Sequence, residues 1–88
     1  MDDLEITYDV IEMEVPVEPT EANEKRIAIE LQVSYDAVTI YEEPGSDKTI
    51  LEVVSDSSVC ETLRNQGDFF LSIADALNID REDIKELV

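Results

Sequence analysis

The sequence contains no histidine and no tryptophan, and it has only one cysteine and two glycines among its 88 residues. Without histidine, the chain lacks the commonest general base, the usual partner of a catalytic Ser or Cys, and a leading metal ligand. Gly45 and Gly67 lie too far apart in the sequence to form a glycine-rich phosphate loop. We therefore expect no enzymatic activity, no catalytic residues and no cofactor.

Cys60 has no second cysteine with which to form a disulfide, which fits a reducing compartment. Its position near an apolar helical stripe predicts a small buried side chain rather than a reactive thiol. No apolar run approaches the roughly 18 residues of a membrane span. The start Met1-Asp2-Asp3 lacks the positive charge of a secretory signal. We expect a mature, cytoplasmic protein that does not bind membranes.

Basic residues are scarce, since 6 Lys and Arg face 23 Asp and Glu and leave a net charge of −17. Solubility of a small domain needs a net charge of only about 2 to 8, and self-repulsion destabilises the compact state. Direct binding to nucleic acid is opposed, because phosphate contacts need a basic patch. Three explanations remain, namely a high-salt cytoplasm, a cationic partner and neutral drift. The excess of Glu over Asp disfavours the first.

Alternating apolar residues predict strands within the first 55 residues of a single compact domain spanning residues 1–88. The predicted strands are 4–15, 27–35 and 48–55. Val38 and Ile40 continue the alternation on the opposite parity, and the alternative is four shorter strands. The alternation slips at Val10-Ile11, which predicts a bulge there, and again at Asp36-Ala37, which predicts a bulge or a tight bend. Pro44 and Gly45 predict a turn. Residues 4–55 are thus predicted to form an antiparallel meander of three to four strands.

From residue 58 apolar residues recur at helical spacing, namely Val59, Leu63, Phe70, Ile73, Ala74 and Leu77. Leu63 and Phe70 are predicted to lie in the core. Ser58 to Glu61 has the form of a capping box, and the spacing predicts one long helix over 58–77. The alternative is a break at Gly67, with Asp68 capping a second helix. Asp80 is expected to cap a short last helix over 81–88. Strands followed by helices indicate an α+β fold.

The carboxylates near the end of the chain do not form a calcium loop. Asn78, Asp80, Glu82 and Glu86 lack the glycine at the sixth position and the acid at the twelfth that an EF-hand requires. We therefore predict no metal site.

Acidic residues are concentrated in residues 1–24, which contain nine acids and no base. Carboxylates two apart on one strand face lie about 6.7 Å apart, which is of the order of the spacing between phosphates on a nucleic-acid strand. The predicted partner-binding residues are Glu12, Glu14, Glu18, Glu21, Glu24, Glu42, Glu43 and Asp47. The alternative is that these side chains form only a solvated face.

The charge pattern favours a small inhibitor or decoy that binds the cationic groove of a nuclease or other nucleic-acid-binding protein by charge mimicry. In size and charge, the chain resembles the DNA-mimic proteins that phages use against restriction or CRISPR enzymes. That resemblance implies electrostatic occlusion of a basic partner, without direct binding to nucleic acid. The alternatives are an immunity or antitoxin protein for a basic partner, and an assembly subunit whose strand edges pair with a copy of itself, as in a homodimer.

Overall fold

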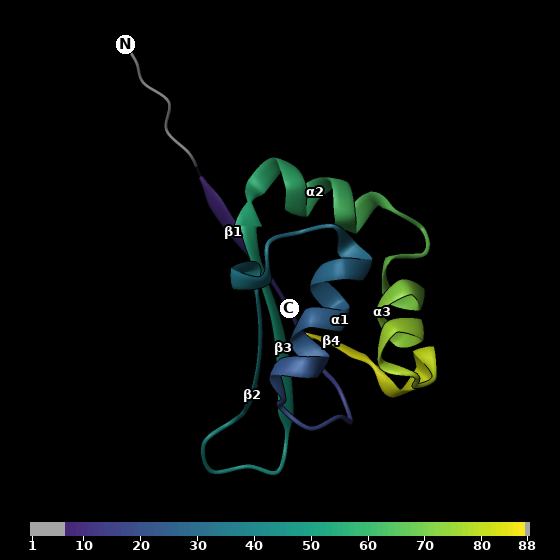
Figure 1. The fold of residues 1–88 in the computed structure, drawn as a ribbon. Coiled ribbons are helices and arrows are strands. Elements are labelled where there is room, and N and C mark those ends of the chain that lie inside the picture. Colours follow the sequence, from purple (N-terminus) through teal and green to yellow (C-terminus); the bar gives the residue numbers. More distant parts are fainter. Residues whose placement is uncertain (1–6, 88) are drawn as a thin grey trace.

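Four strands form one antiparallel sheet, and three helices lie on one side of it (Figure 1). The computed structural model describes residues 7–87. The strands are β1 (Tyr8–Glu14), β2 (Val38–Glu42), β3 (Thr49–Asp56) and β4 (Lys85–Leu87), in the spatial order β2-β3-β1-β4. The helices are α1 (Glu21–Leu31), α2 (Ser57–Asn65) and α3 (Phe69–Leu77). The predicted α+β class and antiparallel sheet are confirmed.

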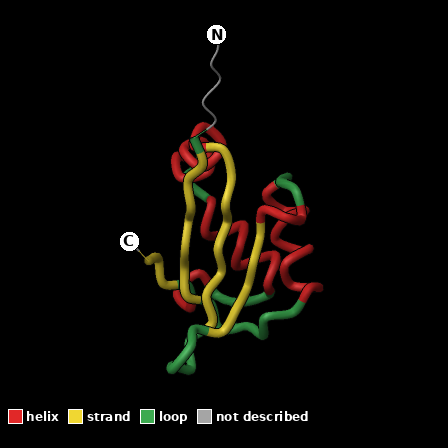
Figure 2. Tube along the Cα trace, turned by 90° about the vertical axis from the view of Figure 1, so that its left-hand side faces the viewer, coloured by secondary structure: helices red, strands yellow, loops and turns green. Residues whose placement is uncertain are grey.

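The helices gather on one side of the sheet (Figures 1 and 2). Alternate strand residues point toward them and form one apolar core with the buried helix residues. The strands contribute Ile11, Met13, Val38, Ile40, Leu51 and Val53, and the helices contribute Ile27, Ala28, Leu31, Cys60, Leu63, Phe69, Ile73, Ala74 and Leu77. Among residues 7–87, no helix is long and apolar enough to cross a membrane.

The predicted strand over 27–35 is corrected by the structure, which has α1 over most of this range. The Thr20 hydroxyl accepts a hydrogen bond from the Asn23 amide at 3.2 Å, which satisfies a free donor at the helix start. Ile27 and Leu31 are buried, whereas Ile29 is 64% exposed. Ile27 and Leu31, which are four residues apart, thus share the buried face of the helix. Together with the exposed Ile29 they alternate as the apolar residues of a strand do, and this pattern led to the wrong prediction. Because α1 connects β1 to β2, residues 4–55 are not a simple meander.

The predicted long helix over 58–77 is divided into α2 and α3. Asp56, not Ser58, caps α2, because its carboxylate accepts the Ser58 amide at 3.1 Å. The residues from 64 to 68 are all exposed and contain no apolar side chain that could hold a continuous helix against the core. Gly67 is also a poor helix former. The break at Gly67 was the alternative prediction.

The predicted last helix over 81–88 is replaced by a 3-10 turn, Arg81–Asp83, followed by β4. Ile84 is buried in the core, and β4 then pairs with β1 from Glu12 to Glu14. A helix over so few residues would leave most of its backbone N–H and C=O groups without partners. Pairing of β4 with β1 provides partners for these groups instead. Val88 lies outside the described residues, as does the start of the predicted first strand, residues 4–6.

The bulge predicted near Val10-Ile11 is absent from the described strand, because β1 pairs with β3 one-to-one from Tyr8 to Glu14. Tyr8 and Val10 instead point away from the helices and are exposed. The apolar pattern slips because the apolar residues before Ile11 lie on one face of the sheet and those from Ile11 onward lie on the other. The bend predicted at Asp36-Ala37 is confirmed as a 3-10 turn, and the predicted turn between β2 and β3 contains Gly45 at a φ of 80°.

Candidate functional site

The face of the sheet turned away from the helices is the main candidate surface, and we call it the open sheet face. No helix in residues 7–87 lies across it (Figures 1 and 2). Its cross-strand rows are Tyr8 with Asp56; Val10 with Val54; Glu12 with Glu52, Thr39 and Leu87; and Glu14 with Ile50, Tyr41 and Lys85. Successive rows lie about 6.7 Å apart along the strands. The open sheet face therefore has two exposed valines toward one end and three carboxylates toward the other, where Lys85 lies opposite Glu14.

Glu12 and Glu52 lie directly opposite each other on β1 and β3. Directly opposed residues of an antiparallel pair have Cβ atoms about 4.5 to 5.5 Å apart, and like charges there destabilise the sheet. Glu14 follows two residues along β1, and all three side chains are only partly exposed. By this rule the pair does not stabilise the sheet.

Tyr41 shows how closely the carboxylates gather. Its hydroxyl donates a hydrogen bond to Glu52 Oε2 at 3.2 Å. Burial is the largest cause that raises the pKa of Tyr41, and the negative charges of Glu52, Glu12 and Glu43 raise it further. These carboxylates therefore act together on one phenol, although they come from three segments of the chain.

Glu52 was missed by sequence reasoning, although a signal for it was present. It lies between Leu51 and Val53 in the predicted strand over 48–55, and alternation places it on the face opposite to theirs. Its proximity to Glu12 depends on the β1–β3 register, which the sequence pattern does not specify. Glu12, Glu14 and Glu43 were predicted, and the structure adds Glu52 and Tyr41 to them.

The acids at the start of α1 belong to a different part of the molecule. Glu24 Oε2 accepts a hydrogen bond from the Ile40 amide at 2.9 Å and so satisfies an edge donor of β2. Glu21 forms an i,i+4 ion pair with Lys25 at 3.2 Å. Glu18 is exposed in the connection before α1, where its carbonyl accepts a hydrogen bond from Asn23. These residues are not brought together with the Glu12–Glu52 pair.

The β2–β3 turn contains the remaining predicted acids. Glu42 ends β2, and Glu43 and Asp47 lie in the turn itself, with all three side chains exposed. The Glu43 amide donates to the Lys48 carbonyl at 2.9 Å, which closes the turn. Glu42 pairs with Thr49 and alternates with Tyr41, so it lies on the helix-side face of the sheet. Glu43 and Asp47 lie beyond this row, at the same end of the sheet as Tyr41.

Comparison with known proteins adds no identification. No family model, no curated protein and no solved structure matches this chain.

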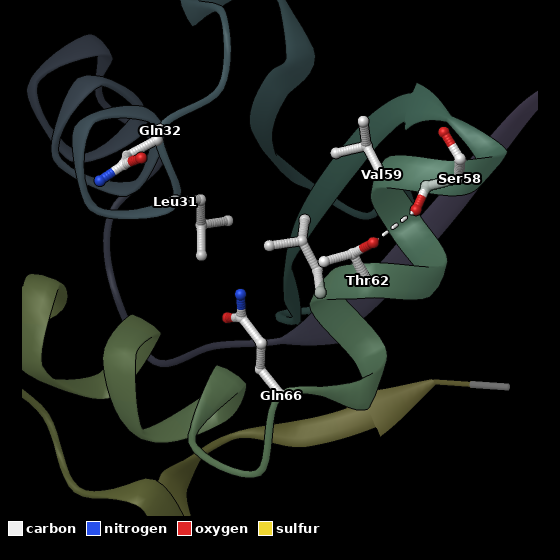
Figure 3. A pocket seen from close by; sticks show the side chains of 7 residues that line it. Leu31, Gln32, Ser58, Val59, Thr62 and Gln66 are labelled. Carbon is white, nitrogen blue, oxygen red and sulfur yellow. Dashed lines mark hydrogen bonds between the residues drawn. The ribbon is translucent and has the colours of Figure 1, made fainter.

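A small pocket lies between the end of α1 and α2 (Figure 3). Its volume is about 290 Å³, and its lining residues are Leu31, Gln32, Ser58, Val59, Thr62, Leu63 and Gln66. The Thr62 hydroxyl already donates to the Ser58 carbonyl at 2.9 Å. None of these side chains is charged, so the lining offers no acid–base pair for catalysis.

A second, polar pocket of about 490 Å³ lies at the start of α1 and is lined by Glu21, Glu24, Lys25, Tyr35 and Asp36. Two of its carboxylates are already engaged, Glu21 with Lys25 and Glu24 with the Ile40 amide. Within residues 7–87, no group of three His, Cys, Asp or Glu side chains is arranged to hold a metal ion. This pocket therefore offers little free chemistry of its own.

Cys60 is fully buried, as predicted. Burial raises the pKa of its thiol, and the Sγ atom lies 3.6 Å from the Asp9 carbonyl, to which it can donate. A protonated, buried thiol is a weak nucleophile. Nearby, Arg64 forms an ion pair with the Asp9 carboxylate and donates to the Val10 carbonyl at 2.9 Å. The arginine lowers the pKa of Asp9 and joins α2 to β1.

Proposed function

We propose that this protein is a non-enzymatic, cytoplasmic decoy that binds the cationic groove of a nuclease or other nucleic-acid-binding protein. The observation that supports the proposal best is the opposed pair Glu12 and Glu52 on the open sheet face. The pair opposes folding, as does the net charge of −17. A cationic partner would reduce the repulsion within the pair and the self-repulsion of the whole chain, because its basic side chains would neutralise the carboxylates.

The geometry of the acidic rows suits a surface that normally binds phosphates. Glu12 and Glu14 lie about 6.7 Å apart along β1, and Glu52 adds a second carboxylate across the strands. Basic residues that are spaced for a phosphate backbone could contact such an array. The high negative charge would also accelerate association with a basic partner at low salt.

The two alternative classes differ in what they require of the surface. An immunity-type protein also binds a basic nuclease, but its contact can lie beside the active site. An assembly subunit needs a free strand edge, and β2 offers little of one. The Ile40 amide is bonded to Glu24, and the Val38 amide is bonded to the Tyr35 carbonyl. The β2 edge therefore disfavours assembly through pairing of this strand with a copy of itself, and we favour the decoy over that role.

The test uses three immobilised forms of the chain: the wild type, Glu12→Gln/Glu52→Gln, and the control Glu30→Gln/Glu61→Gln. Both variants remove two negative charges, and the control residues are exposed on α1 and α2. A host fraction enriched in DNA-binding proteins is passed over each form. We expect a basic protein that the wild type and the control retain, that the first variant retains weakly, and that duplex DNA releases. Equal retention by all three forms would contradict the proposal. Retention that depends on Glu12 and Glu52 but resists DNA would indicate an immunity-type contact instead.

A further inference from the structure

The apolar end of the open sheet face has no role in charge mimicry. Val10 and Val54 lie directly opposite each other and are 40% and 37% exposed. Tyr8 lies in the next row and is 67% exposed. We call these three residues the apolar strip. By comparison, Ile11 and Val53 on the helix-side face of the sheet are almost fully buried. The side chains of the apolar strip are exposed enough to contact a partner.

The apolar strip is continuous with the acidic rows. Val10 and Val54 are each two residues from the opposed pair, Val10 from Glu12 on β1 and Val54 from Glu52 on β3. The apolar and acidic rows are therefore about 6.7 Å apart. A partner that covers the carboxylates would meet the apolar strip at the same time.

Charge complementarity limits what can cover this face. A second copy of the chain would bring another net charge of −17 and another pair of opposed carboxylates against it. Anionic lipid and nucleic acid are opposed by the same sign. A cationic protein surface is attracted, and only a protein can also offer apolar side chains to Val10 and Val54.

We propose that the apolar strip is an anchor that binds an apolar patch beside the basic groove of the partner protein. This inference rests on the proposed function and adds a source of specificity to it. Charge alone would attract any basic groove, whereas well-packed apolar contacts discriminate among partners. The apolar contact also persists when salt screens the carboxylates.

The test uses two short peptide probes, one that alternates Arg with Val and one that alternates Arg with Ser. Binding to the isotope-labelled protein is followed by NMR shifts of the backbone amides. We expect both peptides to shift the amides of Glu12 and Glu52, and only the Arg-Val peptide to shift those of Val10 and Val54. The Arg-Val peptide should bind at least about fivefold more tightly, which is a measurable difference in affinity.

Two variants make the test specific. Val10→Thr/Val54→Thr keeps β-branched side chains suited to strands and should remove the fivefold advantage. The control Val59→Thr changes a residue on α2 that is as exposed as Val54, at 37%, and should keep the advantage. Equal binding of the two peptides, with shifts confined to the acidic rows, would overturn the anchor and leave the decoy proposal standing. The absence of any shift on the open sheet face with either peptide would count against both.

Discussion

Phe69 and Phe70 are adjacent in the chain but occupy different environments. Phe69 is 2% exposed and belongs to the core, whereas Phe70 is only partly buried. The Phe70 ring packs edge-on against the Phe69 ring, with 5.0 Å between the ring centroids. The Arg81 guanidinium carbon lies 4.5 Å from the centroid of the Phe70 ring. Sequence reasoning chose Phe70 for the core, because a single helix starting at residue 58 would turn it inward. The break at Gly67 resets the phase, so that Phe69 points inward instead.

This difference predicts unequal effects of truncation. Phe69→Ala should lower the free energy of unfolding by about 3 to 5 kcal/mol, as expected for a buried aromatic side chain. Phe70→Ala should cost less than about half of that, because the ring is already partly in water. Urea unfolding followed by circular dichroism measures both. A larger loss for Phe70→Ala would contradict the observed phase of α3.

At the scale of elements, the two glycines occupy turns with different backbone requirements. Gly45 lies in the β2–β3 turn at a φ of 80°, which other residues adopt with strain. Gly67 separates α2 from α3 without a positive φ, and a Cβ built on it meets no atom within 4 Å. Only Gly45 therefore needs to be glycine for its backbone.

Alanine at each glycine tests this distinction. Gly67→Ala should raise the free energy of unfolding by about 0.4 to 1 kcal/mol, because alanine restricts the unfolded chain. Gly45→Ala should lower it by roughly 1 to 2 kcal/mol, because of its left-handed backbone. Thermal and urea unfolding of the two variants provide the comparison. Stabilisation by Gly45→Ala would show that the turn does not hold the backbone described here.

Elements that depend on the pattern of neighbouring residues could be predicted from the sequence, whereas elements that depend on contacts with distant segments could not. The strands near β1 and β3 and the turn at Gly45 follow from alternation and turn chemistry, and they were found. The helix α1 was missed, because Ile27, Ile29 and Leu31 fit a strand as well as a helix. The strand β4 was missed, because its three residues become a strand only by pairing with β1.

The candidate site was predictable in the same partial way. Glu12 and Glu14 share a strand face by local alternation, so their common orientation could be foreseen. The opposition of Glu12 and Glu52 depends on pairing between strands distant in the sequence, which one sequence does not reveal. The engagement of Glu24 with the Ile40 amide likewise depends on how α1 packs beside β2.

At the scale of the whole molecule, the fold separates its two kinds of surface chemistry. The helices and the inner sheet face hold one apolar core, and within residues 7–87 no charged side chain is fully buried. The charges of the described residues therefore lie at or near the surface, where salt screens the repulsion between them. The pair of Glu12 and Glu52 is the clearest place where that repulsion is built into the sheet itself.

A double-mutant cycle on this pair tests most directly whether the acidic face opposes folding and so requires a role outside the fold. The variants are Glu12→Gln, Glu52→Gln and the double variant. Glutamine keeps an acceptor for the Tyr41 hydroxyl. The free energy of unfolding is measured with urea at low salt and again at about 0.5 M NaCl. We predict that each single variant is stabilised by about 0.2 to 1 kcal/mol. The double variant should gain less than the two singles together, and this repulsive coupling should shrink at high salt. Single variants that are less stable than the wild type, or a coupling of zero at low salt, would contradict the account.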